Sequence, residues 1–158
     1  MTGATSLPDG VAFDDTSAEG CARSFISAVV WGAHRWVWEL LSVEGRDLVL
    51  RIAGRGGFDP AVMEPARRGT WSLEESDPFL ANLVRGIRVD LSRVDMTAIE
   101  VSPAEPDDGG RWRVAMFTPV AFVTDVPGWP AGSVVVKRTD QGWRVDRLVI
   151  HGVETGAP

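Results

Sequence analysis

The chain has 158 residues, 44% of them hydrophobic and 24% charged, which is enough for one globular domain with a single apolar core. Sixteen basic and 22 acidic residues leave a formal net charge of -6, which argues against a general nucleic-acid-binding surface because such a surface needs a basic face. One cysteine and two histidines exclude an internal disulfide and a multi-cysteine or histidine-rich metal site, and we expect no cofactor.

We expect no signal peptide at the start of this sequence and no membrane span. Residues 1–15 lack the positive region and apolar stretch of a signal peptide, and no window is long and apolar enough to span a membrane. We therefore expect a cytoplasmic protein without a membrane partner. It would consist of a flexible N-terminal segment (residues 1–15), one domain (residues 16–152) and a short tail (residues 153–158).

The region from residue 16 to residue 54 has the spacing of three helices. Thr16 and Glu19 stand three residues apart, as in a capping box, in which the hydroxyl and the carboxylate each satisfy a free backbone N–H. Apolar residues then recur at helical spacing up to the Gly32-Ala33 step, which can break or bend the helix. A second apolar stripe follows, and Ser42 can cap the third helix.

Two further helices are expected before the strands. Aspartate followed by proline marks a helix start, because aspartate caps the helix and proline fits its first position. Asp59-Pro60 opens one helix that ends near Gly69, and Asp77-Pro78 opens another that continues towards Val94. Residues 86–91 also alternate well enough to form a strand.

After Asp95 the apolar period changes to two, which indicates strands. Strands are expected at residues 96–101, 111–124, 133–138 and 142–151, with an acidic loop at 103–110 and a Pro/Gly connection at 126–132. In the last strand, the residue on the same face as Val145 is either Arg147 or, after a bulge, Leu148. The order predicts an α+β domain with helices packed on one face of a curved, mostly antiparallel sheet.

Three stretches resemble the NTF2-like superfamily, in particular its SnoaL-like and ketosteroid-isomerase-like branches. They are residues 38–46 (WELLSVEGR), 112–117 (WRVAMF) and 134–146 (VVVKRTDQGWRVD). The resemblance implies a cone, in which the concave face of a bent sheet wraps around the helices and encloses an apolar pocket. It also implies a homodimer. Members include isomerases, cyclases, hydrolases and dehydratases as well as non-catalytic modules, so the fold does not fix the function.

Two residues are candidate proton carriers within that fold. His34 lies one turn before Trp38, and an inward-facing imidazole could act as a general acid or base near neutral pH. The alternative is a histidine that packs on the helix surface. Asp90 is among the carboxylates nearest the sheet, where burial would raise its pKa. The alternative is a solvated carboxylate or an exposed ion pair with Arg88.

The expected pocket wall is mostly apolar, with a sparse polar anchor. The absence of tyrosine departs from ketosteroid-isomerase chemistry, which usually needs a tyrosine oxyanion donor, so that mechanism is not carried over. For each wall residue the alternative is ordinary core packing. The expected ligand-binding residues are Trp38, Met63, Trp71, Met116, Thr118 and Phe122.

Two functions follow from these patterns. The first is a protein that binds a small hydrophobic molecule in the cone, or a cofactor-independent enzyme with isomerase, cyclase or hydratase chemistry in a biosynthetic or catabolic pathway. The alternative is a non-catalytic dimerisation or protein-interaction module whose cone is filled by its own seven tryptophans. An empty apolar cavity on the order of 300 Å³ or more favours the first function.

Overall fold

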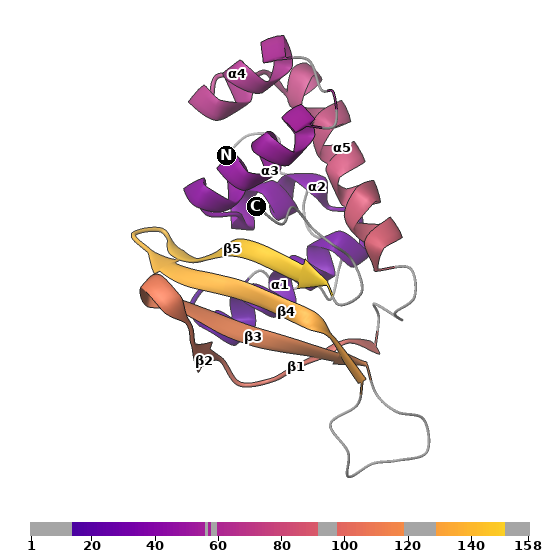
Figure 1. Ribbon diagram of the computed structural model, residues 1–158. Helices are drawn as coiled ribbons and strands as arrows, with labels where there is room; N and C mark the ends of the chain where they lie inside the picture. The colour runs from indigo at the N-terminus through magenta and orange to yellow at the C-terminus, as the bar shows by residue number, and fades with distance from the viewer. Residues whose placement is uncertain (1–13, 56, 58–59, 92–97, 119–128, 151–158) are drawn as a thin grey trace.

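The computed structural model describes residues 14–55, 57, 60–91, 98–118 and 129–150, in which the helices precede the strands (Figure 1). The helices are α1 (Ala18–Val30), α2 (His34–Leu40), α3 (Val43–Arg55), α4 (Pro60–Arg68) and α5 (Leu73–Asp90). The strands are β1 (Glu100–Val101), β2 (Glu105–Pro106), β3 (Arg111–Thr118), β4 (Trp129–Thr139) and β5 (Gly142–Ile150). This order confirms the α+β class.

The strands form one antiparallel sheet. β3, β4 and β5 are consecutive neighbours, and β1 and β2 both pair with the free side of β3. α1 packs across β3, β4 and β5, whereas α2 and α3 lie mainly against β5, so these two helices stack beside the β5 edge of the sheet (Figure 1). The sheet is not strongly curled, which corrects the expected cone. Two of the five strands have only two residues each, leaving too few long strands to wrap around the helices.

Helix α1 starts one residue later than its sequence suggests. Ser17 is the N-cap, and its hydroxyl accepts the Gly20 N–H at 2.9 Å. The Glu19 carboxylate does not close the expected capping box with Thr16, because it accepts the Ala104 N–H at 2.8 Å. The predicted apolar stripe is confirmed as the buried face of this helix, through Cys21, Ala22, Phe25, Ala28 and Val29.

Helix α5 starts before Asp77-Pro78, so that predicted start is wrong. Ser72 caps the helix by accepting the Glu75 N–H at 3.2 Å, and its hydroxyl donates to the Glu75 carboxylate at 3.2 Å. This side-chain cap outweighs the proline signal, and Pro78 lies inside the helix. Because the helix runs to Asp90, most of residues 86–91 is helical rather than extended.

The strand predictions hold for the central parts of β3, β4 and β5, whereas of the strand expected at residues 96–101 only Glu100–Val101 is extended among the described residues. β4 begins at Trp129, inside the expected 126–132 connection, and the expected 103–110 loop contains β2 and a 3-10 turn at Asp108–Gly110. Val94, residues 96–97 and 119–124, residue 151 and both expected flexible ends, apart from residues 14–15, fall outside the described residues.

A β-bulge in β5 joins the sheet to the helices. Val136 pairs with Val145 and Val135 with Arg147, so Asp146 is the extra residue and Leu148 follows on the Val145 face. Leu41 forms a parallel bridge with Val145, and the Ser42 N–H donates to the Val145 carbonyl at 2.8 Å. The bulge thereby fixes the α2–α3 junction against the edge of β5.

The Asp146 side chain completes this junction. It is 4% exposed and accepts hydrogen bonds from the Ser42 hydroxyl and from Arg111 Nε on β3. A buried carboxylate requires such partners, since an unpaired buried charge is strongly unfavourable.

Among the described residues, none of the helices combines the length and apolar character that a bilayer span requires.

Candidate functional site

The first group of expected ligand residues lies in the core. Trp38 of α2 packs against Trp71, with ring centres 5.2 Å apart, and against Phe79 of α5 at 6.3 Å in an edge-to-face arrangement. Trp71 and Phe79 are 5.6 Å apart, and we call these three rings the aromatic cluster. Met63 and Met116 are also buried in the core. Aromatic packing thus fills the space beside Trp38.

A charged side chain covers the aromatic cluster. The Arg46 guanidinium carbon lies 5.2 Å from the centre of the Trp38 ring, and Arg46 Nε donates to the Trp38 carbonyl at 3.1 Å. Burial lowers the pKa of Arg46. A ligand role for the aromatic cluster residues stays a prediction, as it does for Thr118, half-buried at the end of β3. Phe122 lies outside the described residues.

His34 belongs to a polar clamp between α2 and α5. Its Nε2 lies 3.2 Å from Asp77 Oδ1, and Arg35 donates to both oxygens of that carboxylate at 3.0 and 2.8 Å. The hydrogen bonds from Arg35, followed by the one with His34, lower the pKa of Asp77. The His34 imidazole is therefore engaged with a carboxylate at a half-exposed position.

The second expected catalytic residue lies far along α5. Asp90 is the last residue of this helix and is exposed, thirteen residues after Asp77. At 1.5 Å per residue this separation is roughly 20 Å along the helix axis. The structure therefore does not bring His34 and Asp90 together, and their acid/base roles stay predictions.

A groove of about 670 Å³ lies where the first turn of α1 meets the β4–β5 hairpin end of the sheet; we call it the tryptophan groove. It is lined by Asp15, Thr16, Ser17, Ala18, Glu19, Ala104, Trp112, Arg138, Gly142 and Trp143. Its volume falls in the range of small-molecule sites.

Strand register places the key side chains of the tryptophan groove on one sheet face. Trp112 pairs with Val136, and Arg138, two residues further along β4, pairs with Trp143. Val136 is buried in the core that the sheet shares with α1, so these side chains lie on the face towards that helix. Trp112 is 37% exposed and Trp143 is half-buried, so both indoles offer apolar surface.

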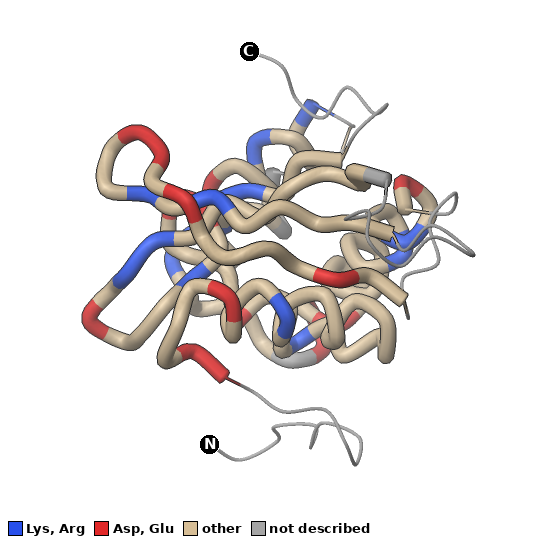
Figure 2. Tube along the Cα trace, turned by 90° about the horizontal axis from the view of Figure 1, so that it is seen from below, with Lys and Arg blue, Asp and Glu red and all other residues tan. Residues whose placement is uncertain are grey.

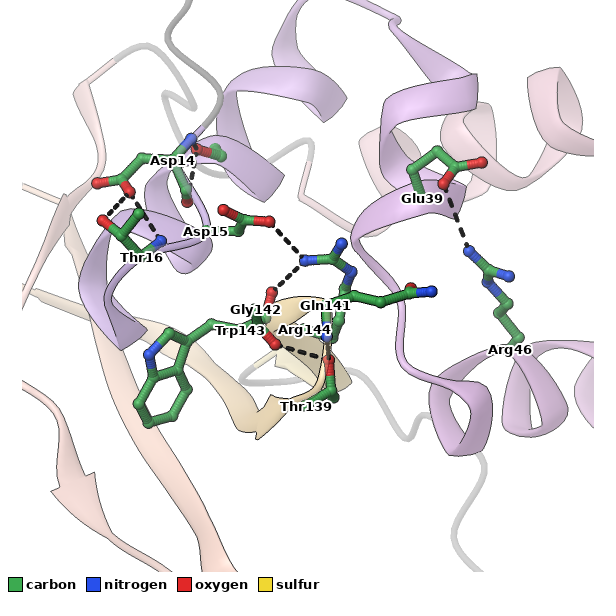
Figure 3. A network of polar contacts seen from close by, with 11 residues as sticks. Asp14, Asp15, Thr16, Glu39, Arg46, Thr139, Gln141, Gly142, Trp143 and Arg144 are labelled. Atoms are coloured by element: carbon green, nitrogen blue, oxygen red, sulfur yellow. Dashed lines mark hydrogen bonds and ion pairs between the residues drawn. The ribbon is translucent and has the colours of Figure 1, made fainter. Parts of the chain in front are cut away.

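The acidic groups of the tryptophan groove already have partners (Figure 3). The Asp15 carboxylate accepts Arg144 Nη1 at 3.0 Å, while the Asp15 carbonyl accepts the Trp143 N–H at 2.9 Å. The Trp143 indole points away from this ion pair (Figure 3). The Glu19 hydrogen bond to the Ala104 N–H lowers the pKa of Glu19. Both carboxylates therefore stabilise the wall of the groove.

Arg138 differs from these carboxylates. It is exposed, and no ion-pair partner for it is found in the part of the chain that the structure describes. Lys137, its neighbour on the opposite face, pairs with Glu44 at 2.8 Å. Arg138 is thus the only basic residue among the described residues that line the tryptophan groove.

A second, smaller groove of about 340 Å³ runs between α1 and β1. It includes Trp31, which is 58% exposed, together with Val30 and Ile99. Arg23 is its single charged residue. Its one tryptophan makes it a useful reference for the tryptophan groove.

Charges of both signs are spread over the described part of the chain. In the view of Figure 2, Lys and Arg are interspersed with Asp and Glu along the described trace. Among the described residues, no group of three His, Cys, Asp or Glu side chains could hold a metal ion. The thiol of Cys21 is buried, and burial raises its pKa to about 12, so it is a poor nucleophile.

Sequence reasoning missed the groove although it placed part of it. The alternation that puts Trp112 on the face of Met116 was visible, and a hairpin at residues 139–142 brings Arg138 opposite Trp143. The contact of Glu19 with Ala104 joins positions 85 apart, and no local pattern indicates it.

Comparison of the chain with models of known protein families, with curated proteins and with solved structures found no match.

Proposed function

We propose that this protein binds a small, flat, apolar molecule in the tryptophan groove. The observation that carries the proposal is the presence of two accessible indoles, Trp112 and Trp143, on one face of a 670 Å³ groove. Indoles offer large, rigid apolar surfaces at small entropic cost. A stacked ligand would remove from water the part of Trp112 that is now exposed.

A binding function accounts for the groove better than acid/base catalysis does. Its two carboxylates, Asp15 and Glu19, are held in place by hydrogen bonds. A general base needs a free lone pair within reach of the proton that it removes. The filled aromatic cluster also supports the non-catalytic alternative expected from the sequence. Proton transfer by His34 is the second candidate, and His34→Ala tests it.

The relation to the NTF2-like superfamily is part of the proposal. The order of helices before an antiparallel sheet supports it, while the weak curl of the sheet weighs against an enclosed cone. In this protein the ligand would lie at the open end of the sheet, beside α1, instead of inside a cone. The homodimer expected from the resemblance stays a prediction.

Native mass spectrometry of freshly purified protein is the first test of retained ligand and of subunit count. A noncovalent adduct of a few hundred daltons that is lost under denaturing conditions would support the proposal. Indole N–H signals in NMR spectra then locate a neutral flat probe, 2-naphthamide. We expect the signals of Trp112 and Trp143 to shift and that of the buried Trp38 to stay unchanged.

The matched variants are Trp112→Ala and Trp31→Ala, since both remove an exposed indole beside a groove. Trp112→Ala should weaken 2-naphthamide binding about tenfold or more, as loss of one stacked aromatic contact does. Trp31→Ala should leave binding unchanged. Equal binding by wild type and Trp112→Ala would refute the proposed site.

A further inference from the structure

We infer that the ligand of the tryptophan groove is a monoanion, a flat apolar ring system with one carboxylate, and that Arg138 selects it. This inference rests on the proposed function and names its ligand class. The chemistry follows from the position of one guanidinium between two indoles, and from the pairing of every other charge in the groove.

Arg138 stands on the central of the three strands that carry the site. Trp143 faces it directly on β5, and Trp112 lies diagonally across on β3. Side chains so related approach one another within about 5 Å for the direct pair and about 8 Å for the diagonal one. A ring resting on either indole would therefore hold its carboxylate within reach of the Arg138 guanidinium.

The charge balance of the groove favours an anion at Arg138. Asp15 is neutralised by Arg144 at 3.0 Å, and the Glu19 carboxylate accepts the Ala104 N–H. Among the described residues, no hydrogen bond joins the Arg138 side chain to the neighbouring turn, where the Thr139 hydroxyl donates to the Gly142 carbonyl at 2.7 Å. A guanidinium binds carboxylate through paired N–H donors, a geometry that a neutral amide cannot match.

The same balance limits the charge of the ligand. Two carboxylates line the groove, and the whole chain has a formal net charge of -6. A polyanion such as a nucleotide triphosphate would meet a single arginine and repulsion from Glu19, whose carboxylate accepts only a backbone N–H. One carboxylate on an apolar ring matches one guanidinium that has no ion-pair partner among the described residues.

The test uses two probes of one shape, 2-naphthoate and 2-naphthamide, titrated into the full-length protein at neutral pH. We expect wild type to bind the carboxylate about tenfold more tightly than the amide, the size of a charge-assisted hydrogen bond. Arg138→Gln should abolish this preference by weakening the binding of the carboxylate about tenfold. The matched control is Arg147→Gln. Arg147 is an exposed arginine of β5, and its register partner Val135 places it on the sheet face away from the groove. This variant should retain the preference.

The outcomes separate this inference from the proposed function. Equal binding of both probes by wild type, with Trp112→Ala still weakening both, overturns the role of Arg138 and leaves the proposed site standing. A preference that survives Arg138→Gln also overturns it. If neither probe binds, or if Trp112→Ala has no effect on either, both proposals fall. Added salt should reduce the affinity for the carboxylate, and the affinity for the amide should stay unchanged.

Discussion

Two groups of tryptophans in this molecule have opposite environments. Trp38 is 7% exposed because Trp71, Phe79 and the guanidinium of Arg46 close around it. Trp112 is 37% exposed and lies near the start of β3, where it lines a groove with the first turn of α1. The comparison teaches that the ends of neighbouring helices decide whether an indole becomes core or binding surface.

The largest expected effect separates the two groups by stability. Trp38→Ala should lower the free energy of unfolding by about 3–5 kcal/mol, since it leaves a cavity among packed rings. Trp112→Ala should cost about 1 kcal/mol or less, as expected for a side chain at the surface. Urea denaturation monitored by circular dichroism measures both. Similar losses in the two variants would break the comparison.

Asp146 tests the junction that holds the helices beside the sheet. Asp146→Ala leaves Arg111 and Ser42 without their shared acceptor and should cost about 1–3 kcal/mol. Hydrogen exchange should accelerate at the Ser42 N–H, which donates to the Val145 carbonyl. Asp140→Ala, in the exposed hairpin turn, is the control and should change neither quantity. Unchanged exchange at Ser42 in Asp146→Ala would show that the backbone contacts hold the junction alone.

Cys21 tests the core side of the comparison through the pH dependence of stability, because it lies on the buried face of α1. Burial raises its folded pKa to about 12, above the ordinary value near 9, so the folded state favours the neutral thiol. The stabilisation is fully present below the unfolded pKa and is lost as the pH rises from about 9 to about 12. Wild type should lose stability in this window more steeply than Cys21→Ala. The absence of tyrosine removes another group that titrates there.

The measurement is urea denaturation of both proteins at several pH values across that window. A second readout is alkylation of the thiol by iodoacetamide, which should be slow in the native protein and fast in urea. Parallel pH profiles of wild type and Cys21→Ala, together with rapid native alkylation, would mean that the core behind α1 is open to solvent.

The smallest expected effect concerns the clamp between α2 and α5. The pKa of Asp77 is lowered by Arg35 and then by His34, so its stabilising contribution is present above the unfolded pKa near 4. It is lost as the pH falls through the lower folded pKa. Asp77→Asn should therefore weaken the dependence of stability on pH in acid and slightly speed hydrogen exchange in the first turns of α5. Asp90→Asn, at the exposed end of the same helix, should do neither.

Local patterns in the sequence predicted the helices better than their starts, and they were insufficient for the site. The stripe through Cys21 and Phe25 predicts the buried face of α1, because helical spacing is set by the backbone alone. The predicted start of α5 was wrong because two helix-start signals compete. The Ser72 hydroxyl makes two hydrogen bonds with Glu75, whereas Pro78 adds none. The expected curl failed because it depends on strand lengths that alternation does not determine.

The candidate site was beyond local patterns for a further reason. Trp38 and Trp112 are the same residue type, and both stand on apolar faces of their elements. Their exposure differs because different distant residues lie against them. Phe79 covers Trp38, whereas residues 15–19 line a groove beside Trp112 and leave its indole accessible. Such contacts are made only when the chain is folded, and they separate core from groove.

The bridge between Leu41 and Val145 has a consequence for association between molecules. A strand at a sheet border presents free N–H and carbonyl groups that can recruit strands from other copies. At Val145 the bridge and the Ser42 N–H occupy that border, and the bulge at Asp146 interrupts its regular spacing. On the opposite border, β1 and β2 are two residues long and include Glu100, Glu105 and Pro106. These features limit strand pairing between copies of the protein at both described borders of the sheet.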